Sequence, residues 1–204
     1  MDENELKADL IKSLAAQMIA DGVIDPTGMS AKEFRAAFVA EARAIVAEDG
    51  GFSVILDHQD SVLEQAQAFE ASGKADFAIT FYATWIEHRL NDMFIWKVKR
   101  LGKPQSEAVE LIRLNSVKRK TGKVWTDTFG HELDTDIVAT ILDIADRRNA
   151  FVHYKWQAMG DEEMDDAKAE KAAVLAKTEP LVRQLIELRT DMVFGDSTGF
   201  LDKL

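Results

Sequence analysis

The sequence predicts an all-α protein, and two observations support this prediction. Apolar residues recur at three- and four-residue steps along most of the chain, which is the period of an amphipathic helix. Only three prolines and eleven glycines interrupt the 204 residues, so long helices fit better than many short strands. There is no cysteine, which excludes disulfides, zinc ribbons and thiol chemistry. We therefore expect one helical bundle with an appendage.

The first 57 residues are expected to form an N-terminal helical extension. An amphipathic pattern over 4–21 predicts a first helix that ends at Gly22. Ser30 begins the sequence SAKE, which has the spacing of a capping box, so a second helix is expected to start there. The apolar run at 52–56 fits either an extended linker or a helix start. We interpret it as the hinge to the main domain.

The main domain is expected to span 58–195, followed by a tail at 196–204. Its expected helices cover 59–71, 74–101, 106–115, 137–156 and 161–193. Residues 116–132 are basic and contain Gly and Thr, so they are expected to form a loop. Asp134 or Thr135 is expected to cap the helix that follows, because both residue types favour the N-cap position.

The charge of the chain is unevenly distributed. The formal net charge of −11 disfavours simple non-specific binding to nucleic acid. From Lys97 to Lys123, however, nine basic and two acidic residues give +7, so the remainder carries −18. Such a strip could meet a phosphate backbone, with Lys118, Arg119 and Lys120 as candidate RNA-binding residues. The alternative is a solvated helix end followed by a charged loop.

Several classes of protein do not fit the sequence. The acidic N-terminus lacks the apolar core of a secretory signal, and no apolar run approaches the roughly 20 residues that span a bilayer. We therefore expect a cytoplasmic protein without membrane contact. The acid-rich DEEMDD at 161–166 could coordinate a divalent ion by composition alone, but an acidic first helical turn explains it better. No metal site and no cofactor are expected.

Three polar residues interrupt the apolar stripes of the expected helix 137–156. Arg148, Asn149 and His153 occupy positions at which the pattern requires apolar residues. Burying such groups is costly unless they are paired, so they indicate a cleft, a subunit interface or both. Asn149 and His153 share a helix face, whereas Arg148 and His153 lie about 140° apart around the helix. A two-fold dimer would bring the arginines and histidines together.

A second polar intrusion lies on the expected helix 74–101. Glu87 interrupts a face that otherwise holds Ala83, Leu90, Phe94 and Val98. A carboxylate there requires a cation, and Arg148 or His153 is the candidate. The alternative partners are Arg89, Asn91 and a lysine of the following loop.

The remaining histidines and the neighbouring arginine have simpler interpretations. Arg147 is expected to pair with Asp143 at i,i+4, which is a purely structural role. His88 is interpreted as a structural residue on an amphipathic face. His58 and His131 fall in connecting segments and are not assigned to the site.

The motif Arg-Asn-x-x-x-His, late in a helical bundle, resembles the Arg-(polar)-x-x-x-His motif of the HEPN superfamily. The upstream segment FYATWIEHRLNDMF resembles the second core helix of that superfamily, where an acidic residue often follows apolar positions. The resemblance covers residues 58–195 and implies a HEPN-like helical bundle. Many members are metal-independent endoribonucleases of toxin–antitoxin, phage-defence and RNA-processing systems, and they act as homodimers.

The resemblance also implies roles for the motif residues. Arg148 would bind or polarise the scissile phosphate, His153 would serve as general acid or base, and Asn149 would position either group. Tyr154 is a weaker candidate for substrate binding, since some members place a tyrosine two residues after the histidine, where this chain has Lys155 followed by a tryptophan. An antitoxin or defence-system protein would be a partner.

Two other interpretations remain open. The chain could be a non-catalytic HEPN-like module that dimerises and binds a partner protein or nucleotide, which its net charge favours. It could also be an unrelated helical bundle in which the spacing of the arginine and the histidine is a coincidence.

Overall fold

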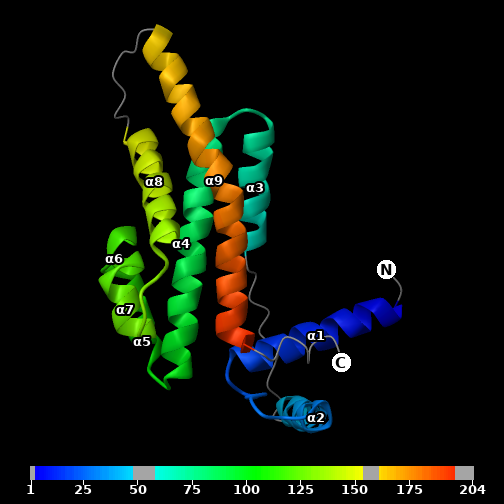
Figure 1. Cartoon of the computed structure of the whole chain (residues 1–204). Coiled ribbons are helices and arrows are strands. Elements are labelled where there is room, and N and C mark those ends of the chain that lie inside the picture. Colours follow the sequence, from blue (N-terminus) through cyan, green and yellow to red (C-terminus); the bar gives the residue numbers. More distant parts are fainter. Residues whose placement is uncertain (1–2, 48–57, 154–160, 196–204) are drawn as a thin grey trace.

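The computed structural model describes residues 3–47, 58–153 and 161–195, and within these ranges the chain forms helices and no strand (Figure 1). The predicted all-α class is therefore confirmed for the described residues. None of the described helices is long and apolar enough to cross a membrane. The helices are α1 Glu3–Ala20, α2 Ala31–Ala47, α3 Gln59–Ala71, α4 Ala75–Arg100, α5 Gln105–Arg113, α6 Val117–Thr121, α7 Lys123–Phe129, α8 Thr135–Val152 and α9 Asp161–Phe194.

Helix α4 forms the centre of the bundle. It contacts α3, α5, α7, α8 and α9, and the long helices α4 and α9 run side by side (Figure 1). Because neighbours surround it, α4 buries side chains around much of its circumference, including Trp85, Leu90, Met93 and Phe94. Burying an apolar side chain of this size contributes roughly 1.5–3 kcal/mol. Helix α4 is thus a rigid support for any polar residue that it carries.

The segment 116–132 forms the two short helices α6 and α7, so the prediction of a loop was wrong. Trp125 is fully buried, with its ring centroid 4.2 Å from Phe129 and 6.0 Å from Phe94 of α4. Helices of five and seven residues are too short for their periodicity to be recognised, and they gain stability from tertiary packing. Packing of Val124 and Trp125 against the bundle therefore orders this segment.

Helices α1 and α2 form an N-terminal pair across one end of the bundle, with a small core of their own (Figure 1). The predicted capping box is confirmed: the Ser30 backbone N–H donates to Glu33 Oε2 at 2.8 Å, and the Glu33 N–H donates to Ser30 Oγ at 3.3 Å. Gly22, with φ of +71°, follows the end of α1, where a left-handed conformation favours glycine. Phe194, at the end of α9, packs against the core of the pair.

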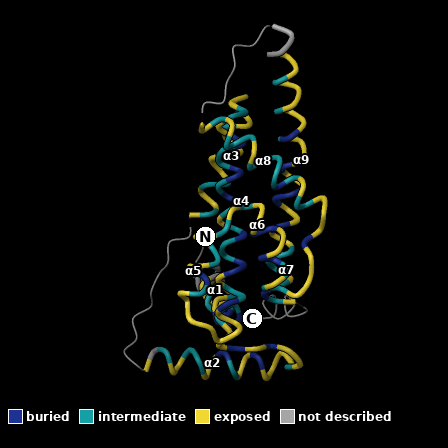
Figure 2. Tube along the Cα trace, turned by 90° about the vertical axis from the view of Figure 1, so that its left-hand side faces the viewer, coloured by how far each residue is buried: buried dark blue, intermediate teal, exposed yellow. Residues whose placement is uncertain are grey.

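Most other predicted boundaries agree with the structure to within two residues, but the predicted end of the 137–156 helix was wrong, because α8 ends at Val152 and His153 is its C-cap. Asp134 caps α8, because its Oδ1 accepts from the backbone N–H groups of Asp136 at 2.9 Å and Ile137 at 3.1 Å. The predicted hinge at 52–56 and the tail at 196–204 lie outside the described residues. Buried residues concentrate in the middle of the bundle, whereas α2 is largely exposed (Figure 2).

Candidate functional site

Glu87 and Arg148 meet between the two helices that carry them. Arg148 Nη2 on α8 donates to Glu87 Oε2 on α4 at 3.2 Å. The side chains are 29% and 31% exposed, so the pair lies at the edge of the core and can be reached from solvent. The prediction that Glu87 pairs with a cation from the motif is confirmed for Arg148. Helix packing of α4 on α8 brings together residues 61 positions apart in the sequence.

Lys120 joins the same carboxylate from the opposite side. Its Nζ donates to Glu87 Oε1 at 3.1 Å and to Asn91 Oδ1 at 2.9 Å, and the residue is only 1% exposed. The sequence grouped Lys120 with Lys118 and Arg119 in a surface strip for RNA, which the structure contradicts for this one residue. Lys118 and Arg119 are exposed on α6, whereas Lys120 points into the bundle.

The short helix α6 explains how a lysine reaches the interior. The Ser116 side chain accepts from the backbone N–H of Arg119 at 3.4 Å and so caps the helix. The Thr121 hydroxyl donates to the carbonyl of Val117 at 3.1 Å, and Thr121 is itself buried. These contacts stabilise α6, which packs beside α8, and residues 120 and 121 form its buried end.

Asn91 is part of the site although the motif did not indicate it. It lies four residues after Glu87 on α4, and it was considered only as a partner of that carboxylate. The i,i+4 spacing of two polar residues on a buried face was the one available signal. The donor to Asn91 is Lys120, which the sequence indicated only as an unspecified loop lysine that could pair with Glu87, and that alternative is confirmed alongside Arg148.

Asn149 and His153 lie at the C-terminal end of α8. His153 is the C-cap residue, is exposed, and its backbone N–H donates to the carbonyl of Asn149 at 3.1 Å. Within the described residues, no side chain forms a hydrogen bond with the His153 imidazole or the Asn149 amide. A single chain therefore joins Arg148 to Glu87 and leaves His153 on another part of the helix surface, as the 140° offset requires. Tyr154 lies outside the described residues.

Arg147 differs from its neighbour in having an ordinary structural environment. Its Nη1 donates to Glu170 Oε2 of α9 at 3.0 Å, and its Nε lies 3.5 Å from Asp143 Oδ1. The predicted pair with Asp143 is confirmed, and Glu170 adds a second acid. Two adjacent arginines are thus directed to opposite neighbours of α8.

A groove of about 920 Å³ runs along α4 and includes Asn91 of the cluster, with residues of α1, α5 and α9 in its walls. Several of its charged side chains pair with one another. Arg189 Nε donates to Asp92 Oδ2 at 2.9 Å, and Lys99 pairs with Asp21. These contacts attach α9 and α1 to α4, so the charges of the groove have a structural role.

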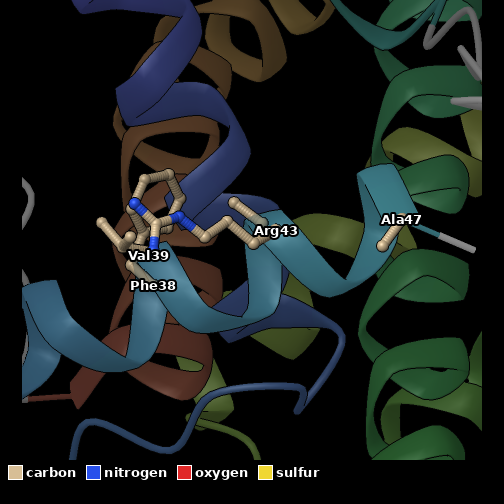
Figure 3. A pocket seen from close by; sticks show the side chains of 5 residues that line it. Phe38, Val39, Arg43 and Ala47 are labelled. Carbon is tan, nitrogen blue, oxygen red and sulfur yellow. The ribbon is translucent and has the colours of Figure 1, made fainter.

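A second, shallow hollow of about 360 Å³ lies on α2 (Figure 3). Its lining is apolar except for Arg43, with Phe38, Val39 and Ala47 beside it. It belongs to the N-terminal pair and contains no residue of the motif.

No cluster of three or more His, Asp or Glu side chains that could hold a metal ion is found in the part of the chain that the structure describes. Comparisons with protein-family models, curated proteins and solved structures gave no match. The geometry of Glu87, Asn91, Lys120 and Arg148 is therefore the main observation on which a functional interpretation can rest.

Proposed function

We propose that this chain is a cytoplasmic endoribonuclease of the toxin or phage-defence type, which cleaves RNA without a metal at a cleft between two copies. Arg148 and His153 would act on the phosphate, Asn149 would position it, and Glu87 would hold Arg148. Lys118 and Arg119, both exposed on α6, would bind the RNA backbone.

One observation carries the proposal. Arg148 is fixed by a carboxylate on the rigid helix α4 while 29% of its side chain remains exposed. An arginine that is both oriented and accessible can make paired hydrogen bonds with phosphoryl oxygens. The exposed His153 follows on the same helix.

The chemistry follows from these two residue types. The RNA 2′-oxygen attacks the adjacent phosphorus, and the bond from phosphorus to the 5′-oxygen of the next nucleotide breaks. The products carry a 2′,3′-cyclic phosphate and a 5′-hydroxyl. One imidazole takes the proton of the 2′-OH and a second, protonated imidazole gives a proton to the leaving 5′-oxygen, so protons balance. The guanidinium stabilises the charge on the phosphoryl oxygens.

A second copy supplies what one chain lacks. Each chain has a single His153, and this residue lies about 140° around α8 from Arg148. An isologous contact between two α8 ends would bring two histidines and two arginines to one cleft. The acid and the base would then come from different copies.

The test compares residues assigned to the site with an arginine and a histidine that are not. Purified protein is incubated with single-stranded RNA in EDTA, and cleavage rates are measured for Arg148→Ala and His153→Ala. We expect each rate to fall roughly 10²–10⁴-fold. Arg147→Ala, which removes the same charge one residue away, and His131→Ala serve as matched controls with near wild-type rates. Equal cleavage by wild type and both site variants would exclude the assignment.

A non-catalytic module that dimerises and binds a partner protein or nucleotide is the second candidate. It is favoured by the net charge of −11 and by the engagement of Arg148 with Glu87 inside one chain. Wild-type protein that leaves RNA intact but sediments as a tight dimer would support this second function. A partner such as an antitoxin would then be the molecule to search for.

A further inference from the structure

The ammonium group of Lys120 is buried, and the one carboxylate that it contacts also binds a second cation. Only 1% of the residue is exposed, and its described partners are one oxygen of Glu87 and the neutral amide oxygen of Asn91. A buried lysine is stable as a cation only when it is paired and hydrogen-bonded. The other oxygen of that carboxylate is bound to Arg148. One acid therefore serves two cations.

The cluster of Glu87, Asn91, Lys120 and Arg148 consequently carries a formal charge of +1. Among the described residues, the ion pairs of Lys120 and Arg148 involve no acid other than Glu87. Asp92, next to Asn91 on α4, pairs with Arg189. Asp143, on α8, lies beside Arg147. Arg148 Nε is also buried and has no hydrogen-bond partner in the described part of the chain. In the part of the chain that the structure describes, no second carboxylate pairs with either of the two cations.

We infer that Lys120 is a positioning residue that neutralises Glu87 from the buried side and so leaves Arg148 free to attract a phosphate anion. Without Lys120, Glu87 and Arg148 would form a neutral pair with little attraction for an anion. Lys120 itself is too deeply buried to touch a ligand, so it acts only through the charge of the cluster. The inference rests on the proposed function, because it concerns the same arginine, and it names a residue that the motif does not contain.

Lys120→Gln separates charge from geometry. The glutamine amide can still donate to Glu87 and Asn91, but the net charge of the cluster falls from +1 to 0. Adding Glu87→Gln to this variant returns the net charge of the cluster to +1, although Lys120 and Glu87 are then both replaced. A purely structural lysine predicts that the double variant binds no better than the single one. The charge mechanism predicts recovery, and this double-mutant comparison distinguishes the two.

Asn91→Asp reaches the same charge by a different route. Aspartate has nearly the shape of asparagine and can accept the hydrogen bond of Lys120, so the contacts of the cluster remain. The net charge nevertheless falls to 0. This variant keeps the inference testable if Lys120→Gln does not fold, since it removes no buried group.

The probe is inorganic phosphate, titrated into the full-length protein at constant ionic strength and followed by NMR shifts of the α4 and α8 amides. We expect wild-type protein to bind with the largest shifts near Arg148, and Lys120→Gln and Asn91→Asp to bind roughly 10-fold more weakly. The double variant should return to within about threefold of wild type, because it restores the net charge. Lys123→Gln, which removes an exposed charge paired with Asp127, is the matched control and should bind as wild type.

Three results would overturn the inference: no phosphate binding near Arg148, unchanged affinity in Lys120→Gln and Asn91→Asp, or no recovery in the double variant. RNA cleavage measured on the same samples separates the two proposals. If wild-type protein leaves RNA intact but the phosphate affinities of the variants change as expected, only the ribonuclease proposal is refuted. If the protein cleaves RNA but its affinity for phosphate is the same in Lys120→Gln as in wild type, only the role of this lysine is refuted.

Discussion

The N-terminal pair α1–α2 and the bundle α3–α9 are built on different kinds of core. Within the described residues, the core of the pair consists of six buried apolar side chains. The bundle buries nineteen apolar side chains in one cluster, and the polar cluster around Lys120 lies beside them. Buried polar groups restrict how helices can be arranged, because each group requires its particular partner. The pair therefore depends on local signals and a few contacts, whereas the bundle also depends on specific long-range pairing.

The largest expected effect is in the bundle. Trp125→Ala removes a fully buried ring that contacts Phe94 and Phe129, and the space it leaves cannot be refilled by rigid helices. We expect the free energy of unfolding to fall by about 3–5 kcal/mol, measured by urea denaturation with circular dichroism. A loss below about 1 kcal/mol would mean that α7 is not integral to the bundle core.

Phe34→Ala is the matching change in the N-terminal pair. Phe34 is 1% exposed and is among the largest side chains of the small core. Hydrogen exchange should accelerate in α1 and α2 and stay unchanged in α4 and α8, because the two cores can open separately. Uniform acceleration across the whole chain would show that the pair and the bundle unfold as one unit.

The same contrast explains what the sequence could predict. The 59–71 helix and the capping box at Ser30 were recognised because their signals are local. Glu87 and Arg148 were recognised as polar interruptions of long apolar stripes, and they do pair. Helices α6 and α7 were missed because they are short and depend on packing against distant residues, as Trp125 does against Phe94. Lys120 was misplaced for the same reason, since on a loop it would have remained at the surface.

A smaller effect is expected at the capping box of α2. Ser30→Ala removes the side chain that accepts from the backbone N–H of Glu33, which should cost about 1 kcal/mol of stability in the N-terminal pair. The hydrogen bond from the Ser30 hydroxyl also lowers the pKa of Glu33 below its usual value. Because the folded-state pKa is depressed, this contribution is present above the unfolded pKa and is lost as the pH falls through the folded one.

The capping-box effect can be checked by hydrogen exchange of α2 at neutral and at acidic pH. Wild-type protein should lose part of the protection of α2 as Glu33 becomes protonated, and Ser30→Ala should show a weaker dependence on pH. Ser116→Ala, which removes the side chain that caps α6 in the bundle, is the matched control and should leave the pH dependence of α2 unchanged. An identical pH dependence in Ser30→Ala and wild type would show that the box does not stabilise α2.

The smallest effect on stability is expected at an ion pair that joins the N-terminal pair to the bundle. Lys99 on α4 pairs with Asp21 after α1, and the two side chains are 51% and 34% exposed. Solvent screens such a pair, so Lys99→Gln should cost less than about 1 kcal/mol and the effect should shrink at high salt. Lys103→Gln, which breaks a pair with Glu107 inside the bundle, is the matched control. Faster hydrogen exchange in α1 for the first variant alone would show that the pair aligns the two regions. Equal exchange in both variants would assign that alignment to the apolar contact of Phe194 with the small core.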